Sequence, residues 1–164
     1  MGNSFEKESR VFQSNAQKIS PPHYLATVIR EQFRSPFQVF RTIKRIVAQY
    51  LNVSYLMKKK EFLAMVHEVF GLEPAEDGKK LYKMFRVRNP QGVKVVNVLE
   101  VLSTLILNAD FGHTNEKDLL HNAELIEHKM NLILILFDFR ESARVNVVEV
   151  MIMARTIMQG FAKL

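Results

Sequence analysis

Oxygen-bearing side chains recur between Asp138 and Glu149 at intervals that suit a bound cation. Counted from Asp138 as position 1, Ser142 is at position 5, Asn146 at position 9 and Glu149 at position 12. Calcium takes six to eight oxygen ligands, several of them anionic, and a twelve-residue loop can supply them. Apolar residues at helical spacing precede and follow this stretch, so the sequence predicts a cation-type loop between two helices.

Other positions of the same loop oppose calcium binding. Position 3, which normally offers an oxygen, is Arg140; position 6, normally Gly, is Ala143; and Arg144 adds a second positive charge. A cation roughly 4–6 Å from a divalent ion costs kcal/mol even at a surface-like dielectric. We therefore expect no calcium and no other cofactor, and we expect Glu149 to cap the loop through backbone hydrogen bonds. The vestigial ligand set is Asp138, Ser142, Asn146 and Glu149.

The same frame occurs twice upstream with fewer acidic residues. One copy spans 50–61 and the other spans 86–100, which is 15 residues long where the standard loop has about twelve. This repetition predicts an all-α fold of EF-hand-like helix–loop–helix repeats, two of them paired and a third following. Strands are expected only as short β-pairs between loops, around Met57, Val95 and Val145.

Helical periodicity and capping residues divide the chain into units. Ser20 and the two prolines after it open a leading helix at 22–34, and Ser35 caps the next helix, at 36–50. The predicted organisation is a flexible polar tail at 1–19, a lobe with the leading helix and the first two units at 20–108, a connector at 109–122 and the third unit at 123–164.

Two apolar stripes at helical spacing are predicted to face the core. The first consists of Phe37, Phe40, Ile43, Val47 and Tyr50. The second leads into the loop at 138 and consists of Ile126, Met130, Ile133, Leu134 and Phe137.

The third unit has no fourth unit to pair with, and one helix–loop–helix cannot bury its apolar face alone. An uncovered patch of that size is an interaction site or an aggregation liability. Two alternatives stay open: the third unit packs on the helix at 22–34, or it takes an amphipathic helix from another protein. The predicted partner-binding residues are Ile133, Leu134, Phe137, Met151, Ile157, Met158 and Phe161.

Positive charge is concentrated in the first third of the chain. The net charge is +6; residues 1–61 hold 11 Lys/Arg and 4 Asp/Glu, whereas residues 62–164 hold 12 and 13. This asymmetry predicts an acidic partner such as a tubulin-like surface or an anionic membrane; the alternative is a solvated helix face. Nucleic acid is not expected, because no nucleic-acid-binding motif is present. The predicted basic surface consists of Arg41, Lys44, Arg45, Lys58, Lys59 and Lys60.

The N-terminus offers a lipidation candidate. Gly2 would be exposed after removal of Met1, as N-myristoylation requires, although Glu6 stands where the pattern has Ser or Thr. The first residues lack the apolar core of a secretory signal, and no apolar run approaches the roughly 18 residues of a membrane span. We expect an intracellular protein.

Signatures of catalysis are lacking. The sequence contains no GxSxG, no Gly-rich phosphate loop and no HExxH, and without Cys it cannot perform thiol chemistry. The histidines have no metal-ligand spacing: His23, His67, His113, His121 and His128. We expect that the protein is not an enzyme.

Four short motifs resemble the calaxin and neuronal-calcium-sensor-like EF-hand proteins. They are the apolar helix at 62–72 that ends Phe-Gly-Leu, the Val-Asn-Val-Leu-Glu run at 96–100, the Glu-His-Lys-Met run at 127–130 and Leu-Phe-Asp at 136–138. The chain departs from the family's pattern in its lost acidic ligands, in an insertion around 109–122 and in having no fourth unit. The resemblance implies an axonemal protein of the dynein-arm docking machinery, or else a membrane-associated calcium sensor.

The favoured hypothesis is therefore a non-catalytic, calcium-independent EF-hand-like adaptor fixed in a larger assembly, axonemal or otherwise cytoskeletal. Its partners would be an amphipathic helix at the third unit and an acidic surface at the basic one. The alternative is an N-myristoylated, membrane-associated regulatory subunit that resembles a calcium sensor.

Overall fold

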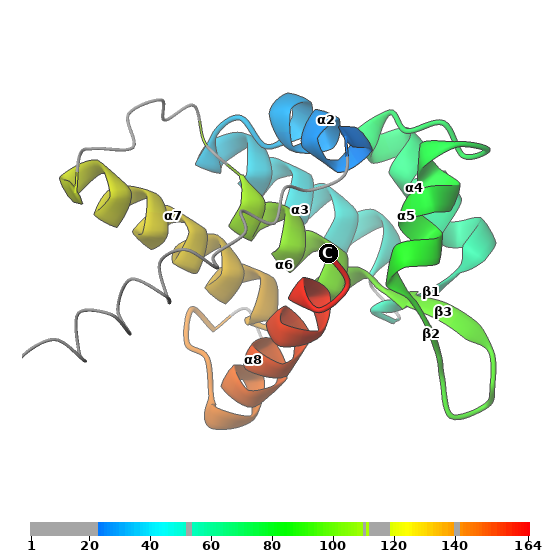
Figure 1. Cartoon of the computed structure of the whole chain (residues 1–164). Coiled ribbons are helices and arrows are strands. Elements are labelled where there is room, and N and C mark those ends of the chain that lie inside the picture. Colours follow the sequence, from blue (N-terminus) through cyan, green and yellow to red (C-terminus); the bar gives the residue numbers. More distant parts are fainter. Residues whose placement is uncertain (1–22, 52–53, 110, 112–118, 140–141) are drawn as a thin grey trace, which may run out of the picture.

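The computed structural model describes residues 23–51, 54–109, 111, 119–139 and 142–164. This part is mostly helical, with a small sheet at one side (Figure 1), so the predicted all-α class is confirmed. Gly2, Arg140 and the expected tail at 1–19 lie outside it. The elements in chain order are α2 (His23–Gln32), α3 (Pro36–Tyr50), β1 (Leu56–Lys58), α4 (Lys59–Phe70), α5 (Asp77–Phe85), β2 (Arg86–Arg88), β3 (Lys94–Asn97), α6 (Val98–Asn108), α7 (Leu119–Phe137) and α8 (Val147–Phe161).

Capping residues begin and end several helices, and the cap at Ser35 is the predicted one. The Ser35 hydroxyl accepts a hydrogen bond from the backbone N–H three residues later, at 3.3 Å, and starts α3. Gly71 ends α4 with φ +67°, a left-handed conformation that favours Gly. The Asn97 side chain accepts from the N–H of Leu99 at 3.1 Å and starts α6.

A three-stranded antiparallel sheet in the order β1-β3-β2 joins the first two loops. Met57 pairs with Val96, so the expected β-pair around Met57 and Val95 is confirmed. The third strand, β2, was not predicted; the loop at 86–100 is long enough to form a hairpin of its own. Asn89 shapes its turn by accepting two backbone N–H groups, at 3.1 and 2.9 Å. Val145 lies outside any strand, contrary to the prediction.

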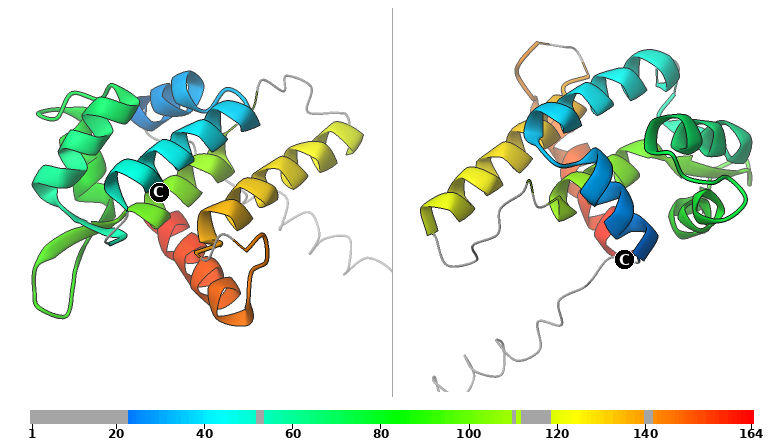
Figure 2. Two further views of the ribbon diagram at one scale, coloured as in Figure 1. Left: turned by 180° about the vertical axis from the view of Figure 1, so that it is seen from behind. Right: turned by 90° about the horizontal axis from the view of Figure 1, so that it is seen from above.

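Helix α6 runs through the middle of the helical part (Figures 1 and 2). Every residue from Val98 to Ile106 is buried, and α2, α7 and α8 all pack against this helix. A single core joins the first two units to the third, since Phe62 and Phe85 belong to the same buried cluster as Phe137. The third unit is therefore packed into the fold rather than separate from it.

The buried face of α3 differs from the predicted one. Val39, Ile43 and Ile46 are buried, whereas Phe37 is 69% exposed. Both stripes pass through Ile43, and helical spacing alone cannot choose between two stripes that share a residue. The contacts of α3 with α7 and α4 make that choice.

The buried face of α7 is also shifted from the prediction. Leu132, Ile133 and Leu136 are buried against α3 and α6, while Ile126 is 61% and Met130 is 41% exposed. One of the two open alternatives placed the third unit on the helix at 22–34; the structure shows it packed on α3 and α6.

Truncation of two isoleucines of α7 should therefore have unequal effects. Ile133→Ala should lower the free energy of unfolding by about 2–5 kcal/mol, because it leaves a cavity in the core. Ile126→Ala, the matched control, should change it by less than about 0.5 kcal/mol. Urea unfolding followed by circular dichroism measures both; equal effects would contradict this packing of α7.

Candidate partner-binding surface

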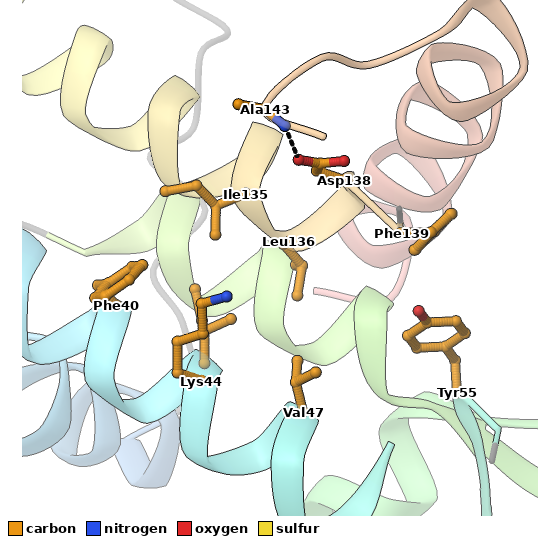
Figure 3. A pocket seen from close by; sticks show the side chains of 10 residues that line it. Phe40, Lys44, Val47, Tyr55, Ile135, Leu136, Asp138, Phe139 and Ala143 are labelled. Atoms are coloured by element: carbon orange, nitrogen blue, oxygen red, sulfur yellow. Dashed lines mark hydrogen bonds between the residues drawn. The ribbon is translucent and has the colours of Figure 1, made fainter. Parts of the chain in front are cut away.

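The first half of the loop after α7 is closed by Asp138. One oxygen of its carboxylate accepts hydrogen bonds from the N–H of Ser142 at 3.0 Å and from the Ser142 hydroxyl at 3.3 Å. The other accepts from the N–H of Ala143 at 2.7 Å, as Figure 3 shows. The predicted ligands Asp138 and Ser142 thus bind each other.

The second half of the loop is closed by a reciprocal pair. The Glu149 carboxylate accepts from the N–H of Asn146 at 2.7 Å, and the Asn146 side chain accepts from the N–H of Glu149 at 2.9 Å. This capping box starts α8, and Glu149 is buried. The expectation that Glu149 caps the loop through backbone hydrogen bonds is confirmed.

The four vestigial ligands therefore form two hydrogen-bonded pairs at opposite halves of the loop. Within the part of the chain that the structure describes, no three His, Cys, Asp or Glu side chains gather closely enough to hold a metal ion. What this arrangement does is hold the loop in shape with the chain's own hydrogen bonds.

Ala143 occupies position 6 of the loop, where Gly is usual, and its backbone has the conformation that a Gly would adopt there. Its φ is +55°, in the left-handed region where a Cβ atom is strained. The loop thus keeps its sharp turn although the residue that normally makes it is absent. The hydrogen bonds that the Asp138 carboxylate accepts from the turn offset the cost of this strain.

The last residues of the other two loops also bond within the chain. The Glu61 carboxylate accepts from the N–H of Lys58 at 3.0 Å and starts α4, as Glu149 starts α8. Glu100 is buried and forms an ion pair with the ammonium of Lys163. That ammonium also donates to the carbonyl oxygen of Phe85 at 3.2 Å. Lys163, just beyond α8, thus fastens the chain's last turn to α5 and α6.

The third loop packs on the first unit beside a pocket of about 300 Å³ (Figure 3). The ring of Phe139 lies 5.1 Å from the ring of Tyr55, centroid to centroid. Phe40 and Val47 of α3 and Leu136 of α7 line the same pocket. Burial raises the pKa of the Tyr55 hydroxyl. These residues come from distant segments, so no local pattern predicts the pocket.

The fully buried residues of α8 are small or polar, and half-buried Met153 and Ile157 pack against the core beside them. The fully buried residues, which face α6, are Glu149, Thr156 and Gly160. A Cβ atom at Gly160 would overlap the hydroxyl of Thr104 and lie 3.0 Å from the carbonyl oxygen of Glu100. The two helices therefore approach closely at a point where only Gly fits.

The outer face of α8 is apolar, the reverse of an ordinary surface helix. Large apolar residues gather there at exposures between 40% and 76%. A cluster of this kind on a single helix is typical of an interaction surface. The outer apolar residues of α8 are Val147, Val148, Val150, Met151, Ile152, Met158 and Phe161.

The predicted partner-binding residues divide between the core and this outer face. Ile133 and Phe137 are fully buried, so their assignment to a partner is wrong: they pack inside the chain. Leu134 and Ile157 are half-buried. Three of the predicted residues do lie on the exposed outer face: Met151, Met158 and Phe161. Sequence reasoning missed four more on it: Val147, Val148, Val150 and Ile152.

The predicted basic residues are all exposed, but they are not all free charges. Arg45 forms an ion pair with Glu68 at 2.9 Å, and the Tyr50 hydroxyl donates to the same carboxylate. Hydrogen bonds from Tyr50 and Arg45 lower the pKa of Glu68, and partial burial together with Glu68 raises the pKa of Tyr50. The exposed set is Arg41, Lys44, Arg45, Lys58, Lys59 and Lys60.

Comparison with known proteins assigns no relative. No family model, no curated protein and no solved structure matches this chain. In the described residues, no helix has both the length and the apolar character needed to cross a membrane.

Replacement of Ala143 by Gly should stabilise the protein. Gly relieves the left-handed strain, so the free energy of unfolding should rise by about 1 kcal/mol, and Tm by about 2–4 °C. Ala64→Gly, in the exposed middle of α4, is the control and should cost about 1 kcal/mol. Differential scanning calorimetry of both variants checks the loop conformation; destabilisation by Ala143→Gly would contradict it.

Addition of one methyl group at Gly160 should destabilise the protein. Gly160→Ala drives a Cβ atom into Thr104, and such overpacking costs about 1–3 kcal/mol, more than the helical preference of Ala returns. Thr104→Ala in the same chain removes the overlap and should recover most of the loss. Chemical unfolding of the two single variants and the double variant measures this coupling; additive effects would refute the close contact.

Proposed function

We propose that this chain is a non-catalytic, calcium-independent EF-hand-like adaptor that binds a partner protein within an axonemal or other cytoskeletal assembly. The observation that carries the proposal is the outer face of α8, with its large exposed apolar side chains. Exposure of such an apolar face to water costs free energy, and a bound partner that covers the face removes this cost.

Independence of calcium is supported by the hydrogen bonds of the loop. Asp138 and Glu149 are the loop's described carboxylates, and both already accept backbone N–H groups within it. A calcium ion would have to compete with those bonds. It would also meet the positive charge of Arg144.

The exposed basic residues of α3, β1 and α4 support a second contact, with an acidic surface such as that of tubulin. Arg41, Lys44 and the run Lys58–Lys60 are exposed to solvent. Long-range attraction by such charges raises association rates and weakens with salt. In an assembly, this contact would hold the adaptor while α8 holds the partner.

An anionic membrane is the second candidate target, because the outer face of α8 is apolar and the charges beside it are positive. In that role Gly2 would be N-myristoylated. Intact-mass measurement of the native protein detects the fixed increment of one myristoyl group. Its presence, with binding of the protein to anionic vesicles, would favour this candidate over the adaptor.

The adaptor should behave identically with and without calcium. Saturating calcium should leave Tm and the amide NMR spectrum unchanged relative to chelator. The tagged chain should enter its native assembly equally in calcium and in chelator. Cross-linking mass spectrometry measures this as cross-links between the α8 region and other proteins of the assembly. Met151→Glu should abolish those cross-links, whereas Gln159→Glu, on the same helix, should keep them. A calcium-dependent shift in Tm would overturn the proposal.

A further inference from the structure

The outer face of α8 has a regular spacing. Val147, Met151, Ala154, Met158 and Phe161 follow one another at intervals of four, three, four and three residues. This is the a/d pattern by which α-helices pair lengthwise. All five are exposed, and the four large ones are between 41% and 76% exposed. These five residues are called the α8 seam below.

The area of this face suits one more helix. Val148 and Val150 widen the seam at its N-terminal end, where they are 63% and 42% exposed. The largest apolar patch of a typical monomer covers about 300–600 Å². A specific interface buries about 800 Å² on each partner, so a helix paired along a patch of that size would account for much of an ordinary interface.

Among the described residues 142–164, the exposed charges beside the seam are positive. Arg155 occupies a flanking e position and Arg144 precedes the helix; both are exposed, and neither pairs with an acidic side chain of the described residues. Between 142 and 164 the one acidic residue is Glu149, which is buried. Lys163 is already paired with Glu100. Charges at e and g positions select the partner of paired helices, so this border is complemented by acidic residues.

We propose that the α8 seam pairs with an amphipathic helix of another protein, apolar at its a and d positions and acidic at its flanks. This inference rests on the proposed adaptor function and names the class of its partner. A partner helix as long as α8, which has 15 residues, is only marginally stable on its own in water. Because Gly160 and Lys163 fix α8 on α6, only the partner helix has to become ordered on binding.

A second copy of the chain fits the seam less well. Parallel pairing places e positions opposite g positions, and antiparallel pairing places e opposite e. The e residues are Val148, Arg155 and Ala162, and the g residues are Val150, Ile157 and Leu164. None is acidic, so either arrangement leaves Arg155 without a counter-charge. The net charge of +6 on each copy adds repulsion.

The test uses the full chain and two synthetic helical peptides of three heptads. Both peptides have Leu at a and d; one has Glu and the other Lys at every e and g position. Isothermal titration calorimetry at low salt should show at least about tenfold tighter binding of the Glu peptide. The preference should shrink at high salt, because the flanking charges are exposed.

Paired variants separate the seam from general effects. Met158→Glu should abolish binding, and Gln159→Glu, with the same added charge one position off the seam, should leave it unchanged. Arg155→Glu should reverse the preference in favour of the Lys peptide. Lys83→Glu, the same charge reversal at an exposed position of α5, should leave the preference for the Glu peptide unchanged. Circular dichroism confirms that each variant is folded.

Four outcomes would overturn the inference: no binding of either peptide, equal binding of both, an unchanged preference in Arg155→Glu, or a homodimer in sedimentation equilibrium that Met158→Glu converts to a monomer. The homodimer would assign the seam to a second copy. Binding of anionic vesicles, lost in Met158→Glu with neither peptide bound, would assign it to a membrane. The calcium measurements test the adaptor separately, so the inference can fail while the adaptor stands.

Discussion

The contact between α6 and α8 is the constraint on which the rest of the structure depends. Helix α6 is buried throughout from Val98 to Ile106, and the fully buried residues of α8 are small or polar. The ion pair of Glu100 with Lys163 adds a buried charge contact at the end of α8. Such a pair contributes little net stability but is costly to break, so it fixes position. Because the fully buried residues of α8 are small or polar, most of its large apolar residues lie on the outside.

The loops keep their shape through their own side chains. In calcium-binding loops of this length, an ion joins residues from both halves. Here Asp138 holds one half and the pair of Asn146 and Glu149 holds the other, while Ala143 keeps a conformation suited to Gly. These hydrogen bonds lie within the chain, next to α7 and next to α8. In the proposed adaptor they would hold the two helices at one angle.

Local features were predictable from the sequence, and the choice of buried face was not. Caps such as Ser35 and Glu149 act within three residues, so their sequence pattern determines them. Phe37 and Ile126 were assigned to the core because apolar stripes normally face inward, yet tertiary contacts chose neighbouring stripes. The reversal of α8 had a readable signal: Thr156 and Gly160, four residues apart, allow close approach of two helices. The contact of Tyr55 with Phe139 had none, because it joins distant segments.

Gly160 also determines how α8 can move. A helix turns by about 100° per residue, so rotation of α8 by one position would bring Gln159 or Phe161 to the point where only a hydrogen atom fits. Both the position of α8 and its rotation about its own axis are therefore fixed. The helix cannot roll its apolar residues inward when no partner is present, and the free chain must carry them in water. In this fold the lack of a side chain at Gly160 therefore keeps the outer face of α8 exposed. That exposure lowers the solubility of the free protein and leaves the face accessible to a partner.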